Sequence, residues 1–485
     1  MNAIFRRFWT ARPNWLVLMF LLVCGFTGLR LVYLTPIGQV ADEPSHIARA
    51  AALTRGIVIG RKVLSPVGKV SGVMVDQGLI DASVSELVPP GSSLVIPQAR
   101  RDVARRIRWA NRLSFDPASN SLEYLPIFYL PGSLGIGVGH WLGQSPLQAL
   151  YTGRLFMLLV FLLMGGLALQ TARFGRPLLF AFLAVPMTLS LGASFNQDGM
   201  LIAACVLCVA LLTEADVRAP KARWIAAAIF AAVICSKPPY GFLLFCALIP
   251  LRWRGLGRRL LRLSLFAIPA IIWVVVMLHT SFTPYWRTPY HPGPLWSGKA
   301  GEVFTAPNAS ANLYVLIGHP LQFIMMPYHA TIHNFKPLVY SFFGAFGWLS
   351  ILMADPVYHF WELALAAAAL ANLAGSSVQA VPWRLIDALW VLGLAVVTVI
   401  LMELSLYLSW TDVGATIITG VQGRYFLEIV PFLVLALPRL GGVINRISRW
   451  RYAAVSLETV LTLPVVTMTI YDGFYLPHLI YARFS

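Results

Sequence analysis

Long runs of apolar residues alternate along this chain with short polar connections. A helix needs about 20 mostly apolar residues to cross a hydrocarbon core of about 30 Å. The runs therefore predict an all-α polytopic membrane protein, a single integral membrane domain over 1–485 with about eleven transmembrane helices. The expected spans are 14–34, 147–170, 177–194, 198–214, 222–236, 239–251, 260–280, 356–374, 384–408, 423–441 and 452–471. The short spans 222–236 and 239–251, separated by SKPPYG, form either a bent hairpin or two half-buried helices.

Two long segments, 35–146 and 281–355, interrupt this pattern. The arginine-rich connections fall in alternate loops, which the positive-inside rule places in the cytoplasm together with the N-terminus. Both long segments and the C-terminus then lie outside. The first is expected to be a large periplasmic loop, a cap with short helices that include one over 44–56, and the second to contain interfacial helices.

The composition supports a membrane protein, with 58% hydrophobic and 12% charged residues and a mean hydropathy of +0.72. The net charge of +17 comes largely from short basic clusters between apolar runs, so it indicates orientation in a membrane and no nucleic-acid partner. All five cysteines fall within apolar segments, which indicates neither a disulfide framework nor a zinc site. Cys205 and Cys208 have C-x-x-C spacing inside a helix expected to face lipid, so no metal or redox role is predicted for them.

Several charged residues fall at the outer ends of the expected helices. They are Asp42, Glu43, His46, Asp198, Lys237 and Arg424. A carboxylate at this interface could take a proton from an attacking hydroxyl, while the two cations neutralise a phosphate leaving group. Structural explanations are also open: the aspartates could cap helices, and the lysine and arginine could be interfacial anchors.

Two further features have structural and functional explanations. Arg101, Arg105, Arg108 and Arg112 are spaced as one basic stripe on a helix, facing either lipid headgroups or an anionic acceptor. Glu403 lies inside an apolar span, where a buried polar contact explains it better than catalysis. The histidines show no fixed ligand spacing, so no metal site is predicted.

Seven stretches of the chain carry a resemblance to a known bacterial family. They are DEPSHIARAAALTRG, LPIFYLPGSLGIGVGHWLG, LYTGRLF, VPMTLSLGASFNQDGMLIA, SKPPYGFLLFCALIP, FGWL and VQGRYFLEIVPFLVLALP. In this order and at these intervals, over about 14–471, they resemble the membrane family named domain of unknown function 2142. That family looks like a branch of the GT-C glycosyltransferases, which take sugars from polyprenyl-phosphate donors. DEP and QGRYF are the most specific elements.

The resemblance implies roles for particular residues. Asp42 or Glu43 matches the first-loop acidic motif that holds the catalytic carboxylate, and Asp198 resembles the second-loop acidic residue. Arg424 resembles a late-loop phosphate contact and Lys237, more loosely, a donor-binding cation. The chain departs from the family pattern at EYLP, where tyrosine and two prolines are expected, and at Ser350, where aspartate is common.

These observations favour a GT-C-like glycosyltransferase of the bacterial cytoplasmic (inner) membrane, with its active site facing the periplasm. The expected partners are a polyprenyl-phosphate sugar donor, an envelope glycan or lipid acceptor, and membrane lipids. No cofactor is certain, although some GT-C enzymes use a divalent cation. The alternatives are a transporter or flippase of lipid-linked saccharides, or a non-catalytic subunit of envelope biogenesis. A carrier would favour mid-membrane charges, whereas most charges here lie near the ends of spans.

Overall fold

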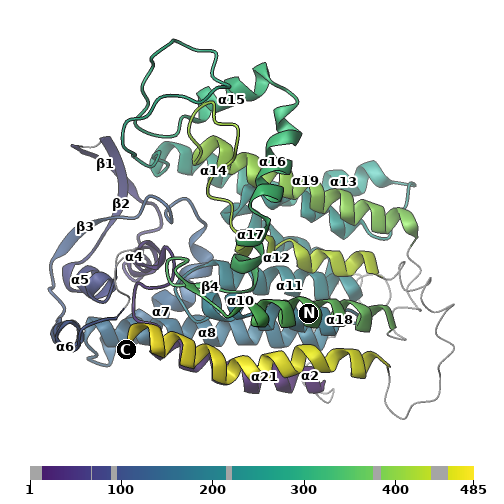
Figure 1. Cartoon of the computed structure of the whole chain (residues 1–485), viewed down its shortest axis with the longest axis horizontal. Helices are drawn as coiled ribbons and strands as arrows, with labels where there is room; N and C mark the ends of the chain where they lie inside the picture. The colour runs from purple at the N-terminus through teal and green to yellow at the C-terminus, as the bar shows by residue number, and fades with distance from the viewer. Residues whose placement is uncertain (1–13, 67, 89–94, 215–220, 375–383, 438–456) are drawn as a thin grey trace.

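The computed structural model describes residues 14–66, 68–88, 95–214, 221–374, 384–437 and 457–485. Long helices lie side by side along one direction (Figure 1). Five helical segments among the described residues are long and apolar enough to cross a membrane. They are Trp15–Leu34 (α2, the π-helix η1 and α3), α8 Pro146–Thr171, Leu256–Thr280 (α13, η4 and α14), α19 Leu385–Ser409 and α21 Leu457–Phe484.

The other expected spans are helical where the structure describes them, but most of these described helices are too short to cross a membrane; 438–441 and 452–456 lie outside the described residues. The helical stretches are α9 Arg176–Ala184, α10 Pro186–Gly192, α11 Asp198–Glu214, α12 Ala222–Ser236, η3 Pro238–Leu248, α18 Asp355–Ala374, η6 Gly423–Phe426 and η7 Val430–Ala436. Proline explains two of the interruptions, because it has no amide hydrogen to continue a helical ladder. Pro186 separates α9 from α10, and Pro238 begins a 3-10 helix directly after α12.

The first long loop contains more than short helices. Strands β1 Arg61–Ser65, β2 Gly68–Asp76 and β3 Leu113–Pro117 form an antiparallel sheet in the order β1-β2-β3, with Val63 opposite Val70. The prediction of helices alone was therefore incomplete, because β1 and β3 have five residues each and contain no buried position that would give an alternating pattern. Helices α4 Glu43–Leu53, α5 Gln77–Ser85, α6 Gln98–Arg106, η2 Pro126–Tyr129 and α7 Leu130–Trp141 complete the segment.

The second long loop projects from the bundle beside α19 (Figure 1). It contains α15 Ala309–Gly318, α16 Gln322–His333, α17 Phe335–Phe343 and the two-residue strands β4 Ala345–Phe346 and β5 Ile351–Leu352. Large apolar side chains such as Ile317 and Ile324 are exposed on α15 and α16, and Leu321 is exposed just before α16. That exposure is typical of helices that lie in a membrane interface.

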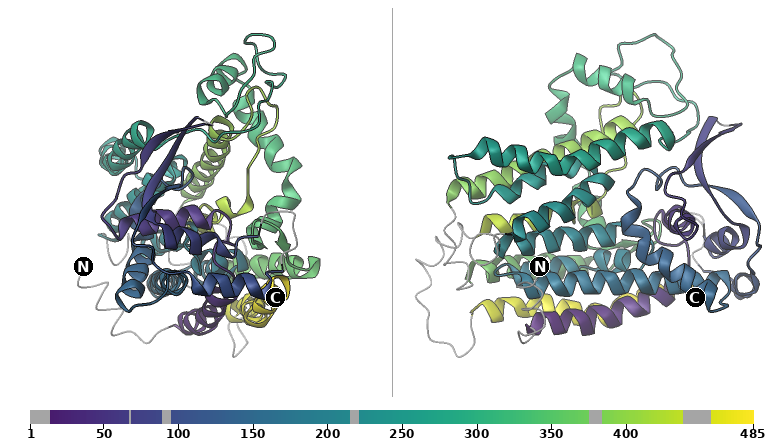
Figure 2. Two further views of the ribbon diagram at one scale, coloured as in Figure 1. Left: turned by 90° about the vertical axis from the view of Figure 1, so that its left-hand side faces the viewer. Right: turned by 180° about the vertical axis from the view of Figure 1, so that it is seen from behind.

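The two long loops and the C-terminus meet at one end of the bundle, as the alternation of the connections predicted. The Ile96 amide donates to the Phe484 carbonyl at 3.2 Å. The Trp348 indole Nε1 donates to the Gly38 carbonyl at 3.2 Å, which joins the second loop to the first. Figure 2 shows the C-terminus beside the first loop from both further viewpoints. We call this the loop end of the bundle.

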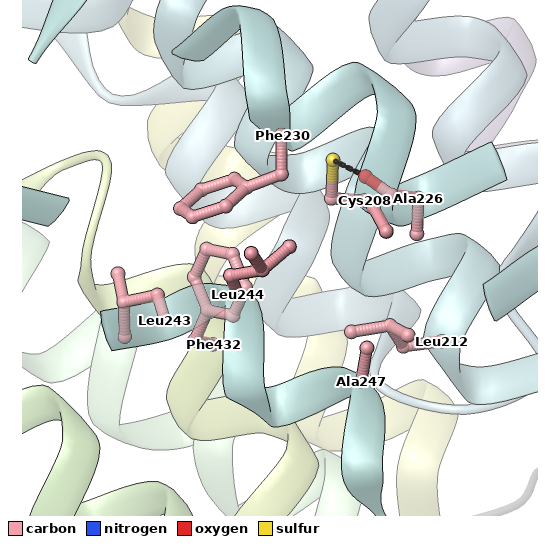
Figure 3. A pocket seen from close by; sticks show the side chains of 9 residues that line it. Cys208, Leu212, Ala226, Phe230, Leu243, Leu244, Ala247 and Phe432 are labelled. Carbon is pink, nitrogen blue, oxygen red and sulfur yellow. Dashed lines mark hydrogen bonds between the residues drawn. The ribbon is translucent and has the colours of Figure 1, made fainter. Parts of the chain in front are cut away.

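Helix α11 is the centre of the core, because all its residues are buried. A pocket between α11, α12, η3 and η7 is lined by apolar side chains that include Phe230 and Phe432 (Figure 3). Cys208 points into it and donates through Sγ to the Ala226 carbonyl at 3.4 Å. The prediction that the helix with the C-x-x-C spacing faces lipid was wrong, because other helices of the bundle cover α11 on all sides. All five cysteines are buried and free.

The expected arginine stripe does not form on one helix. Helix α6 ends at Arg106, so Arg108 and Arg112 lie beyond it. Arg101 turns inward and donates to the Phe484 carbonyl, whereas the Arg105 side chain is 66% exposed beside Asp102. The stripe is divided because α6 ends before Arg108 and because the Phe484 carbonyl binds Arg101.

Candidate functional site

Asp42 and Glu43 are adjacent in sequence but have different environments. Asp42 has the left-handed backbone angle φ 65°, and α4 begins at the next residue with Pro44 in its first turn. A left-handed conformation is uncommon for a non-glycine residue and is enriched at functional sites. Glu43 is fully buried, while the Asp42 side chain is 35% exposed.

Glu43 is held by a buried arginine from α8. Arg154 donates through Nε to Glu43 Oε1 at 2.8 Å and through Nη2 to Oε2 at 2.6 Å. Its remaining N–H groups bind backbone carbonyls that include those of Val32 and Pro36, at 3.0 and 3.1 Å. The carboxylate also accepts the Gly38 amide at 3.0 Å. All the strong acceptor positions of Glu43 are therefore used to fix the turn that precedes α4.

Asp42 contacts the late loop of the chain. Its Oδ2 accepts a hydrogen bond from Arg424 Nη2 at 3.0 Å, and its Oδ1 accepts one from Asn120 Nδ2 at 3.3 Å. The side chain makes no capping hydrogen bond to α4. The capping explanation of Asp42 is thus wrong, because the αL backbone directs the carboxylate toward Arg424.

The backbone reaches this position through a close helix contact. The Gly423 amide donates to Ser341 Oγ on α17 at 2.7 Å. A Cβ atom on Gly423 would lie 1.9 Å from the Leu338 carbonyl oxygen, so only glycine fits there. The Arg424 side chain that follows is 4% exposed, and its Nη1 has no hydrogen-bond partner among the described residues. A buried, paired guanidinium is not an interfacial anchor.

A second ion-pair group lies beside the first. Lys237 Nζ is 2.9 Å from Asp198 Oδ1 and 2.6 Å from Glu428 Oε1. Asp198 Oδ2 is also 3.9 Å from Arg424 Nε, which joins the two groups. We call Asp42, Asp198, Lys237, Arg424 and Glu428 the charged cluster; its three carboxylates face two cations. The lysine side chain is 12% exposed, so it too is no surface anchor.

The side chain at the start of α11 that accepts a backbone amide is that of Asn196, not that of Asp198. Asn196 Oδ1 accepts the Asp198 amide at 2.9 Å, while Asn196 Nδ2 donates to the Ala41 carbonyl at 3.2 Å. The Phe195 amide donates to Glu43 Oε1 at 3.3 Å. These bonds hold the SFNQD connection against the turn that contains Asp42, and they leave the Asp198 carboxylate free to pair with Lys237.

His46 lies on α4, three residues into the helix, and faces two tyrosines. Its Nδ1 forms a 2.7 Å hydrogen bond with Tyr129 Oη, and its ring stacks with the rings of Tyr129 and Tyr124. Burial lowers the pKa of His46 to about 4, although the nearby Asp42 carboxylate acts in the opposite direction. The imidazole is therefore neutral at physiological pH, and it contributes packing and a hydrogen bond rather than charge.

Several polar residues of this region were not predicted from the sequence. Glu428 follows Arg424 by four residues within the same apolar run, and that spacing was the available signal. Gln197 is fully buried, and neither polar atom of its side-chain amide has a partner among the described residues. Glu428 Oε2 and Gln422 Oε1 also have no hydrogen-bond partner among the described residues. Buried polar atoms are normally hydrogen-bonded, so these groups mark the polar interior next to the charged cluster.

The described residues contain no group of three or more His, Cys, Asp or Glu side chains that could hold a metal ion. A role for a divalent cation, which some GT-C enzymes use, stays a hypothesis drawn from the sequence. Glu403 lies elsewhere, on α19, and accepts a hydrogen bond from Thr331 Oγ1 at 2.9 Å. That contact agrees with the buried polar role expected for it.

The comparisons with known proteins identify a family. A family model described as a predicted membrane protein, domain of unknown function 2142, matches residues 24–433. No curated protein and no solved structure matches the chain significantly. The matched range includes every residue of the charged cluster. Since the model covers most of the 485 residues, the chain belongs to the membrane-protein family named domain of unknown function 2142.

Proposed function

We propose that this protein is a GT-C-like glycosyltransferase that moves a sugar from a polyprenyl-phosphate donor to an envelope glycan or lipid acceptor. One observation carries the proposal: a partly exposed carboxylate, Asp42, is held beside the buried Arg424, whose Nη1 is unpartnered within the described part of the chain. A base that water and acceptor can reach thus adjoins a cation with unused donors. We place this site at the outer face of the bacterial cytoplasmic membrane.

The reaction begins at the acceptor hydroxyl. Its oxygen forms a bond to the anomeric carbon of the donor sugar, and the Asp42 carboxylate takes the hydroxyl proton. A single in-line attack inverts the anomeric centre. Asp42 is the stronger candidate for the base, because both oxygens of Glu43 already bind Arg154 and Glu43 is fully buried.

The leaving group is the donor phosphate. As the bond from the anomeric carbon to the phosphate oxygen breaks, the electron pair goes to that oxygen and polyprenyl phosphate departs. The Arg424 guanidinium has the geometry to bind two phosphate oxygens. Lys237 adds positive charge nearby, while Asp198 and Glu428 hold its ammonium in place. No step is assigned to a divalent cation.

The test compares two aspartates that pair with arginines at the loop end. Asp42→Asn should lower sugar transfer from a synthetic polyprenyl-phosphate sugar by about a hundredfold, the usual scale for losing a positioned base. Asp412→Asn is the matched control, because Asp412 pairs with Arg287 at 2.8 Å and is 44% exposed. Equal activity of the two variants would remove Asp42 from the catalytic role.

A second candidate function is transport of a lipid-linked saccharide. The observation that favours it is a pair of carboxylates buried in long helices: Glu403 on α19, and Asp472 on α21, which accepts Trp361 Nε1 at 2.8 Å. Intramembrane carboxylates often line transport pathways. Deletion of the protein, followed by mass analysis of envelope glycans, separates the two. A missing sugar favours transfer, while an accumulated intact lipid-linked oligosaccharide favours transport.

A further inference from the structure

A groove lies on the surface of the bundle away from the charged cluster. Trp224 of α12, Arg262 of α13, and Leu265 and Phe266 of η4 line it. The rings of Trp224 and Phe266 are stacked, with centroids 6.1 Å apart and an interplanar angle of 20°. The groove therefore has an apolar wall of flat side chains and a single cation at its edge.

The position of the groove along α12 places it near the opposite end of the bundle. Trp224 lies in the first turn of this helix, and Lys237 of the charged cluster directly follows its last residue. A rise of about 1.5 Å per residue puts the groove roughly 20 Å along the helix from the cluster. Figure 1 shows α13 at the side of the molecule away from the first loop. Tryptophan at such a position is typical of a membrane interface.

Three exposed arginines lie on α13 or just before it. Arg258 and Arg262 are exposed four residues apart on α13, and Arg254 is exposed just before it. Among the described residues, no carboxylate pairs with Arg262. An unpaired guanidinium over an apolar wall complements a molecule with an anionic head and a hydrocarbon tail.

We propose that this groove is a binding site for an anionic phospholipid. The lipid phosphate pairs with the Arg262 guanidinium, and the first part of an acyl chain lies against Trp224, Leu265 and Phe266. Arg258 faces the same headgroup from one turn earlier on the helix. The site is independent of the sugar-transfer chemistry and belongs to the membrane leaflet opposite the charged cluster.

The test is native mass spectrometry of the full chain in detergent, titrated with phosphatidylglycerol and, in parallel, with phosphatidylcholine. The wild-type protein should bind one phosphatidylglycerol in preference to phosphatidylcholine. Arg262→Gln should weaken that binding about fivefold, the scale for losing one arginine near an anionic surface. Arg254→Gln removes the same charge at the same end outside the groove, so it should bind as the wild type does.

A third variant examines the apolar wall. Phe266→Ala should also weaken phosphatidylglycerol binding, because the acyl chain loses the ring against which it packs. Arg262→Lys keeps the positive charge, so it should retain part of the phosphatidylglycerol affinity. Equal affinity of the wild type for the two lipids would overturn the proposal without any variant. An equal loss in Arg262→Gln and Arg254→Gln would overturn it as well, since it would indicate charge attraction without a site.

Discussion

The adjacent carboxylates Asp42 and Glu43 allow a test of whether neighbours in sequence have separate roles in the fold. Each is changed to its amide, giving Asp42→Asn and Glu43→Gln. The two changes remove the same charge and nearly no volume. We expect Glu43→Gln to destabilise the protein strongly, while Asp42→Asn leaves it folded and impairs transfer.

The magnitudes follow from the contacts of the two side chains. Glu43 and Arg154 both have 0% exposed side chains, and two charge-assisted hydrogen bonds of 2.6 and 2.8 Å join them. Glu43→Gln leaves a buried guanidinium without its counter-charge, which costs about 3–5 kcal/mol. Asp42 is 35% exposed, and an amide oxygen at that position can still accept from Arg424. Asp42→Asn should therefore cost less stability than Glu43→Gln, because Arg424 also keeps the Asp198 carboxylate 3.9 Å from its Nε.

The assay is unfolding of the purified protein in detergent, followed by tryptophan fluorescence, for the wild type and both variants under one set of conditions. The Glu43→Gln midpoint should fall well below that of Asp42→Asn. A double variant with Arg154→Met should recover part of the loss, because an uncharged partner no longer has to be buried as an ion. Equal midpoints for the two single variants would refute the division of roles between these carboxylates.

Four other predictions concern charge and orientation. Arg424→Lys should reduce donor affinity although the charge is kept, because an ammonium cannot bind two phosphate oxygens in a fixed geometry; binding of polyprenyl-phosphate sugar in nanodiscs measures this. Lys237→Met should lower the unfolding midpoint, because the Asp198 and Glu428 carboxylates lose their shared cation at 2.9 and 2.6 Å. The pKa of His46 is lowered from 6.5 to about 4, so between pH 6.5 and 4 only the unfolded chain binds the proton and the free energy of unfolding should fall as the pH falls. His46→Gln should remove this part of the pH dependence, which is worth about 3 kcal/mol at most. A cysteine at the exposed Ser297, in a cysteine-free background, should react with an impermeant thiol reagent in spheroplasts, whereas one at Arg254 should not.

Local patterns in the sequence were sufficient for the positions of the main helices. The expected spans 147–170 and 384–408 correspond to α8 Pro146–Thr171 and α19 Leu385–Ser409. Apolar length and flanking charge are properties of neighbouring residues, so they can be read without a fold. Among the described residues, five segments are long enough to span a membrane. Proline and short 3-10 helices divide several other apolar runs, and periodicity does not show where a helical ladder breaks.

Four residues of the site could be predicted from the sequence, because they fall at predicted helix ends on one side: Asp42, Asp198, Lys237 and Arg424. The sequence did not show which of them pair with one another. Asp42 and Arg424 are 382 residues apart, and Glu43 and Arg154 are 111 apart. Contacts of this kind form only when separate helices pack, and no local propensity encodes them. Gly423 is an example. A glycine permits another backbone to come close, but only the fold shows that α17 lies so near that no other residue fits.

The sequence by itself determined that this is a helical membrane protein of a known family, with its charged candidates gathered at one end of the spans. Tertiary structure decided what each charge does. The left-handed backbone of Asp42 directs its carboxylate toward Arg424, whereas Arg154 of helix α8 pairs with the buried Glu43. The reason is physical: apolar burial depends mainly on composition along the chain, whereas the role of a carboxylate depends on distances of a few ångströms to partners that only the packed bundle supplies.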